Sequence, residues 1–168
     1  MKKIIALALA VVAALSAFGC SKKAYKYDPM TFSASGMEIT LTEGFVSETV
    51  PSDSKVAVAI YKAKEVMVFV IKEEFSKYES LNEMSTEDYA GLIEKNYASL
   101  HAEKVRKIDG LVTVKYKVTT TEGQNLTYFN VVIKGNDAFW VFQFNCNTKL
   151  YNVYEAYFVE WAKSIRVN

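Results

Sequence analysis

The sequence has few of the residues on which metal and nucleophilic chemistry depend. Its 168 residues include one histidine, His101, and two cysteines, Cys20 and Cys146. A zinc site needs three or four clustered nitrogen, sulfur or oxygen ligands, and the spacing of these three residues supplies no such cluster. We therefore expect no metal site, and we interpret His101, which stands in the polar stretch 101–104, as an ordinary surface residue.

The motifs of common enzymes and nucleotide-binding proteins are absent as well. The chain contains no P-loop, no G-x-G-x-x-G, no H-E-x-x-H and no G-x-S-x-G. Its formal net charge is +1, and removal of Lys2 and Lys3 changes that charge to −1. A near-neutral chain has no electrostatic attraction to nucleic acid. These absences predict a protein that is not an enzyme, that needs no cofactor and that binds no nucleic acid.

The only long apolar run lies at the N-terminus. Met1-Lys2-Lys3 precedes the apolar stretch 4–15, and small residues lead from there to Cys20. A charged start, an apolar middle of about 7–15 residues and small residues before a cut form a secretory signal. The uncharged stretch 4–20 is also shorter than the ~20 residues that a membrane-spanning helix needs.

With Cys20 directly after Gly19, this segment resembles a bacterial lipoprotein precursor. The resemblance implies that residues 1–19 are a signal peptide, that Cys20 becomes the diacylglycerol-linked N-terminus and that residues 20–29 form a tether. Two acyl chains give stable membrane attachment where one does not. We therefore expect a protein of the bacterial cell envelope, attached through Cys20 to the outer face of the cell membrane or to the outer membrane. The alternative is an ordinary secretory signal with an incidental cysteine.

Beyond the tether, hydrophobic residues (51% of the chain) and a modest charged fraction (23%) predict an ordered domain. Seven segments have strand character, and several are joined by short glycine turns. In 55–62 and 66–72 both phases are apolar, which predicts cover on both faces of a sheet. The segments are 30–34, 37–41, 55–62, 66–72, 111–120, 125–134 and 138–146.

Two helices are expected. Ser85 and Asp88 have the spacing of a capping box, and apolar residues keep helical spacing from there to Leu100. The second helix covers residues 148–164 and carries a wide aromatic stripe that includes Trp161, which we interpret as core. The order of strands, helix, three-strand meander and helix predicts an α+β domain with a mainly antiparallel sheet.

Two stretches, Gly36-Met37-Glu38-Ile39-Thr40-Leu41-Thr42-Glu43-Gly44-Phe45 and Phe158-Val159-Glu160-Trp161-Ala162-Lys163-Ser164-Ile165, are similar to the opening and closing motifs of the Mog1/PsbP-like group. The resemblance covers residues 30–168, which we take as a single domain. It implies an α/β/α sandwich around the antiparallel sheet. It also implies binding rather than catalysis.

The remaining candidate residues have ordinary structural interpretations. Cys146 would need a base and an oxyanion site to act as a nucleophile, and its strand phase, shared with Phe142 and Phe144, predicts a small buried hydrophobe. Glu73-Glu74 is interpreted as a strand's exit to solvent and Glu87-Asp88 as a helix start. The lysines form either a mild basic patch on one sheet face or a solvated strand face; they are Lys115, Lys117 and Lys134.

The sequence therefore predicts a lipid-anchored, non-catalytic binding or assembly module with a protein partner in the envelope. One alternative is a carrier of a small apolar ligand, favoured by the 10 Phe and 11 Tyr residues. A roomy aromatic pocket beneath the helices would support that alternative. A second alternative is a hydrolase that depends on converging carboxylates of raised pKa.

Overall fold

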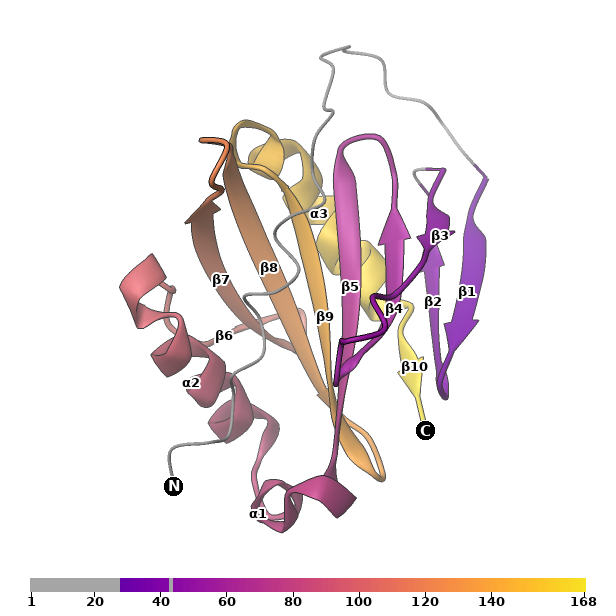
Figure 1. Cartoon of the computed structure of the whole chain (residues 1–168), viewed down its shortest axis with the longest axis vertical. Coiled ribbons are helices and arrows are strands. Elements are labelled where there is room, and N and C mark those ends of the chain that lie inside the picture. The colour runs from indigo at the N-terminus through magenta and orange to yellow at the C-terminus, as the bar shows by residue number, and fades with distance from the viewer. Residues whose placement is uncertain (1–27, 43) are drawn as a thin grey trace.

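A computed structural model describes residues 28–42 and 44–168, so the expected signal peptide and Cys20 lie outside the described residues. The centre of the fold is an antiparallel sheet of seven strands in the order β3-β4-β5-β9-β8-β7-β6 (Figure 1). The strands are β3 (Val46–Glu48), β4 (Ala57–Lys62), β5 (Val66–Glu74), β6 (Arg106–Ile108), β7 (Leu111–Thr119), β8 (Asn125–Lys134) and β9 (Ala138–Asn147). The predicted meander is confirmed as β7, β8 and β9.

A second sheet of three strands has the order β1-β2-β10, with β1 (Met30–Ala34), β2 (Met37–Leu41) and β10 (Arg166–Val167). The expected hairpin of the first two segments is confirmed. Its two-residue turn, Ser35-Gly36, has positive φ at both positions, 52° and 92°. This is the geometry of a type I′ turn, which matches the twist of the strands it joins.

The helical elements connect the strands. They are η2 (Phe75–Lys77), α1 (Glu79–Asn82), α2 (Thr86–Asn96), η3 (Ala98–Leu100), η4 (Thr148–Leu150) and α3 (Tyr151–Lys163). The capping box predicted at the start of α2 is present, because the Asp88 N–H donates to Ser85 Oγ at 3.0 Å and the Ser85 N–H to Asp88 Oδ2 at 3.4 Å. The prediction that this helix continues to Leu100 was wrong. The chain leaves helical geometry at Tyr97 and turns in a short 3₁₀ segment that ends at His101, where φ is 52°.

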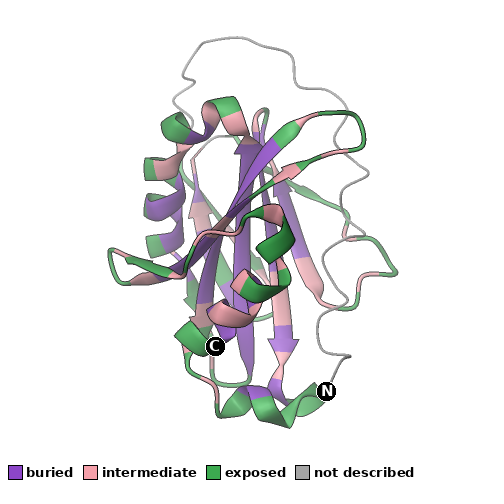
Figure 2. Ribbon diagram, turned by 90° about the vertical axis from the view of Figure 1, so that its left-hand side faces the viewer, coloured by how far each residue is buried: buried purple, intermediate pink, exposed green. Residues whose placement is uncertain are grey.

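Helices α2 and α3 pack on opposite faces of the seven-stranded sheet, which confirms the predicted α+β sandwich. Alternate residues of β9 divide between the two sides. Trp140, Phe142 and Phe144 belong to the core on the α3 side, and Phe139 and Val141 to the core on the α2 side. Figure 2 shows the buried strands between outer elements that carry exposed residues.

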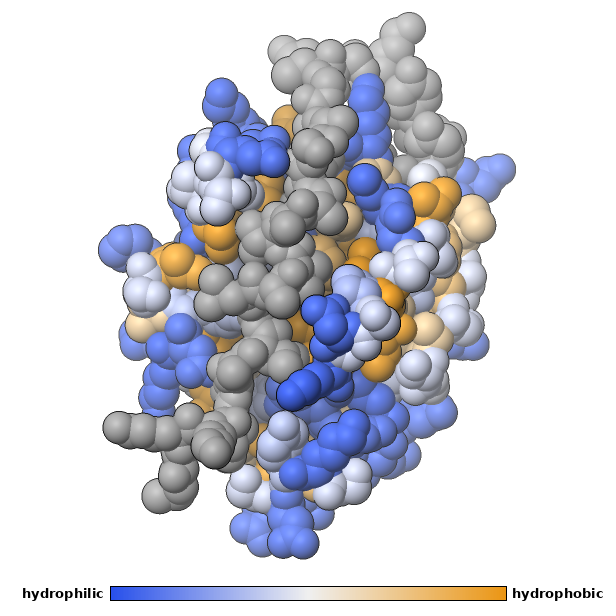
Figure 3. Space-filling view, in the orientation of Figure 1, coloured by the Kyte–Doolittle hydropathy of each residue, from blue (hydrophilic) through white to orange (hydrophobic). Residues whose placement is uncertain are grey.

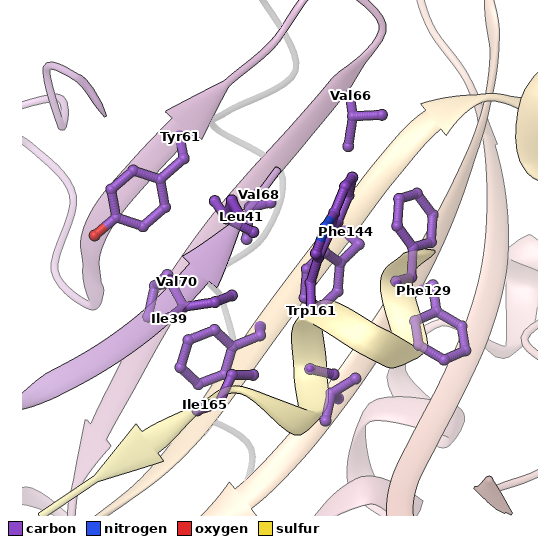
Figure 4. Close-up of a cluster of buried hydrophobic side chains, with 14 of the residues drawn as sticks. Ile39, Leu41, Tyr61, Val66, Val68, Val70, Phe129, Phe144, Trp161 and Ile165 are labelled. Carbon is purple, nitrogen blue, oxygen red and sulfur yellow. The ribbon is translucent and has the colours of Figure 1, made fainter. Parts of the chain in front are cut away.

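The core on the α3 side is filled with aromatic rings (Figure 4). The Phe144 and Phe158 rings lie 5.3 Å apart, and Trp161 meets Phe45 edge to face at 5.2 Å. Trp161 is 3% exposed, and its Nε1 donates to Thr42 Oγ1 at 2.9 Å.

The predicted stripe of the last helix is therefore core in part. Phe158 and Trp161 are buried and join α3 to the sheet and to the chain that follows β2. The expectation was wrong for Val153 and Tyr157, which are 62% and 42% exposed on the outer side of the helix.

No helix in residues 28–42 or 44–168 combines the length and the apolar character that crossing a membrane requires.

Candidate binding groove and buried polar groups

A surface groove of about 510 Å³ lies beside β7, the last long strand at one side of the seven-stranded sheet. One wall comes from the turn after α2 and the other from β7 and the start of β8. The groove was not predicted from the sequence. Its lining includes His101 and two of the three lysines considered above, Lys115 and Lys117. The lining residues are Ser99, Leu100, His101, Glu103, Lys115, Tyr116, Lys117, Thr119 and Asn125.

Alternate residues of β7 direct their backbone N–H and C=O groups toward this groove. The Thr120 N–H donates to Gln124 O at 2.8 Å, so even-numbered residues of β7 bond to β8 and odd-numbered residues point away from β8. The Glu103 N–H donates a hydrogen bond to one of these outward carbonyls, Lys115 O, at 2.7 Å. The chain then turns away, and in the described part of the molecule no backbone group bonds the outward groups of Lys117 and Thr119. We call residues 117–119 the β7 edge.

The groove carries an excess of positive charge. The carboxylate of Glu103 forms ion pairs with Lys115 Nζ at 2.9 Å and with Arg106 Nη2 at 3.2 Å. Its one negative charge is therefore already matched by two positive charges. Lys117 is exposed and forms no ion pair within residues 28–42 and 44–168. It therefore leaves a cation beside the outward backbone groups of the β7 edge.

The three lysines do not share one sheet face, which excludes the first of the two alternatives, a basic patch formed by all three. Lys115 lies on the α3 side, 4.9 Å above the Tyr151 ring. Lys134 lies on the α2 side, where its Nζ donates to Asn82 O at 2.7 Å and to Met84 O at 2.9 Å. The strand phases of β7 and β8 put the two side chains on opposite faces.

Glu73 is buried, at 7% exposure, so its interpretation as an exit to solvent was wrong. Tyr89 of α2 stacks on Phe139 at 4.2 Å, beside the end of β5, and hydrogen bonds to the Glu73 carboxylate. Burial raises the pKa of Glu73, and the hydrogen bond from Tyr89 partly opposes this rise. Glu74 is partly exposed and pairs with Lys77 at 2.7 Å.

Glu73 is the only buried carboxylate in the described range. Glu87 pairs with Lys107 at 2.5 Å, and Asp88 caps α2. No three His, Cys, Asp or Glu side chains in this range form a group that could hold a metal ion.

A second group of polar side chains is buried on the α2 side, and the sequence analysis did not single it out. Tyr97, Tyr116 and Tyr128 stack in parallel, with ring centroids 4.2 and 5.1 Å apart. Asn130 of β8 and Asn145 of β9 are at most 2% exposed beside this stack, in strands that also bury the polar residues Thr127 and Gln143. Asn130 Nδ2 donates to a β7 carbonyl at 2.9 Å, but Asn130 Oδ1 and Asn145 Nδ2 have no hydrogen-bond partner among the described residues.

In the space-filling view of the α2 side, hydrophilic residues surround smaller hydrophobic areas (Figure 3).

Cys146 is buried, at 1% exposure, within the core on the α3 side, as its strand phase predicted. Burial, followed by the nearby Glu65 carboxylate, raises the pKa of its thiol to about 12. His101 is exposed on the groove wall.

Comparison with solved structures shows that the chain has a PsbP-like fold. The cyanobacterial PsbP protein CyanoP from Synechocystis sp. PCC 6803 is similar, with a TM-score of 0.58 and 14% sequence identity over 89% of this chain and 98% of that one. The protein PA94 from Pseudomonas aeruginosa matches with a TM-score of 0.42 and 12% identity over 79% of this chain and 92% of that one. No family model and no curated protein matches the sequence.

Proposed function

We propose that this chain is a bacterial lipoprotein of the Mog1/PsbP-like group, a non-catalytic module that binds or assembles with a protein partner in the cell envelope. Its anchor is a diacylglycerol on Cys20, which attaches it to the outer face of the cell membrane or to the outer membrane. The support for the anchor is the sequence of residues 1–23, in which an apolar run and a small residue precede Cys20 and polar residues follow it.

The observation that carries the binding role is the β7 edge. Backbone donors and acceptors without a partner are costly when water is excluded, and a sheet edge that presents them is a template for another chain. The edge of Lys117–Thr119 borders a groove instead of lying beneath a covering segment of the described chain. This arrangement supports association with a partner more than it supports chemistry on a substrate.

A second candidate is the carrier of a small apolar ligand. The packing beneath α3 is evidence against a carrier, because aromatic rings fill that space. The amide atoms of Asn130 and Asn145 that lack a partner among the described residues favour a carrier, because a ligand with a donor and an acceptor would satisfy Asn130 Oδ1 and Asn145 Nδ2. Native mass spectrometry of the protein from its host tests this candidate. A carrier predicts a bound small molecule that is lost in Asn145→Leu.

The alternative of a hydrolase has the least support, because it needs two carboxylates that converge. The described part of the chain has one buried carboxylate, Glu73, and this group hydrogen bonds to Tyr89 of α2.

Site-specific photo-crosslinking in native cells tests the binding role. A photoreactive residue replaces Thr119 in one strain and Val153 in the other. Thr119 is an exposed residue of the β7 edge that lines the groove, and its replacement leaves Lys117 in place. Val153 lies on α3, is 62% exposed and serves as the matched control for a surface position away from the groove. A binding module predicts one discrete protein adduct that forms from position 119 and not from position 153. Equal adducts from both positions, or none from 119, would contradict the proposal.

A further inference from the structure

We propose that the β7 edge binds an extended, acidic segment of a partner protein, which adds to the seven-stranded sheet as a further strand beside β7. This inference rests on the proposed binding function and names the chemistry of the partner. It does not depend on the lipid at Cys20.

The backbone geometry sets the shape of the segment. Lys117 directs its N–H and C=O away from β8, and Thr119 directs the same groups the same way, two residues further along. Alternate residues of a strand lie about 7 Å apart, which is the spacing at which an antiparallel strand offers its own pairs of backbone groups. The groove beside the edge, about 510 Å³, has room for the side chains of such a strand. Strand addition of this kind takes affinity from the backbone and specificity from the side chains.

The charge of the groove sets the composition of the segment. Lys115 and Arg106 already neutralise Glu103, and Lys117 has no anion beside it among the described residues. On an antiparallel pair, opposite charges that face each other stabilise the pairing and like charges destabilise it. Acidic side chains opposite Lys117 are therefore favoured, and basic ones are excluded.

The same charge argues against a second copy of this chain as the occupant. Two β7 edges paired about a two-fold axis would bring the Lys117 side chains of both copies to the same short stretch of sheet. Lysine on an edge strand opposes such self-association. The charge of the β7 edge therefore disfavours pairing with a second copy of this chain and favours pairing with an acidic partner.

Two labelled seven-residue peptides serve as probes for the purified full-length protein. One alternates glutamate with valine and the other alternates lysine with valine, so they have the same apolar residues and opposite charge. Fluorescence anisotropy measures their dissociation constants at low salt. We expect the glutamate peptide to bind at least about tenfold more tightly than the lysine peptide, and Lys117→Glu to weaken its binding by at least about tenfold.

A matched pair of variants separates the backbone from the charge. Lys117→Ala removes the charge alone, whereas Lys117→Pro removes the charge and the outward N–H. Because that N–H does not bond to β8, proline at this edge position costs no bond of the sheet. We expect Lys117→Pro to bind the glutamate peptide roughly three- to tenfold more weakly than Lys117→Ala, with equal melting temperatures.

Equal binding of the two peptides, absence of binding, or equal binding by the alanine and proline variants would overturn the inference. The crosslinking experiment separates its failure from that of the proposed function. A discrete adduct at position 119 without any preference for the acidic peptide means that the module binds a partner of other chemistry. An acidic preference without an adduct means that the edge is competent but is not used in the envelope.

Discussion

Trp161→Ala is the substitution that most directly tests the packing of α3 on the sheet. The indole is 3% exposed, meets Phe45 edge to face and donates to Thr42 Oγ1. It thus connects the last helix to the chain that follows β2. The substitution removes the ring and this hydrogen bond together.

The size of the effect follows from the buried surface. A tryptophan side chain buries about 150–250 Å², and at about 25 cal/mol per Å² the part beyond alanine corresponds to roughly 3–5 kcal/mol. The lost hydrogen bond adds little, because the half-buried Thr42 can turn to water. For a domain of this size, each kcal/mol lowers the melting temperature by about 3 °C. We expect the melting temperature to fall by about 10–15 °C.

Urea denaturation followed by circular dichroism measures the change in the free energy of unfolding. Val153→Ala is the matched control, because Val153 lies on the same helix and is 62% exposed. The control is expected within about 0.5 kcal/mol of the wild type. A loss below about 1 kcal/mol for Trp161→Ala would refute the assignment of this ring to the core.

Three further predictions concern buried or capping groups. Because the pKa of Glu73 is higher in the folded than in the unfolded chain, the folded chain binds that proton more tightly, and its contribution to stability is lost as pH rises through the folded pKa. Glu73→Gln should therefore be more stable than the wild type at pH 7 in urea denaturation, by a margin that shrinks toward pH 4.5; a margin independent of pH would count against this. Cys146, with its pKa near 12, should react with a thiol reagent at pH 8 only after denaturant is added, and rapid labelling of the folded protein would show that the site opens. Ser85→Ala should lower the free energy of unfolding by about 1 kcal/mol, and an unchanged midpoint in urea would mean that the cap contributes nothing.

Much of the fold could be predicted because local signals and long-range packing agree. The capping box at Ser85 fixes the start of α2 through hydrogen bonds between Ser85 and Asp88. These residues are three apart, so the pattern can be recognised from the sequence alone. The alternation in β9 fixes which side chains face α3, because the side-chain period of a strand is two. Glycine turns between long strands fix the meander.

The errors have a common physical reason, since they concern relations between distant segments. Glu73 reads as a strand end that reaches water, but Tyr89 of α2 covers it, and nothing near Glu73 in sequence reports that helix. Strands β3 and β6 have three residues each, which is too short for a period to appear. The groove beside β7 also needed the structure, because it depends on where the chain turns away after η3.

One early signal of the buried polar group was present in the sequence. Asn130 and Asn145 interrupt apolar runs in strands that are covered on both faces. A buried amide without a full set of partners is uncommon enough to merit attention at the sequence level.

The intact mass of the protein purified from the membranes of its native host tests directly whether a lipid on Cys20 holds the module in the envelope. We expect a chain that begins at Cys20 and carries the added mass of a thioether-linked diacylglycerol, and we expect Cys20→Ser to accumulate as the uncleaved precursor. An unmodified chain that begins at any residue other than Cys20 would contradict the lipoprotein assignment and the localisation that depends on it.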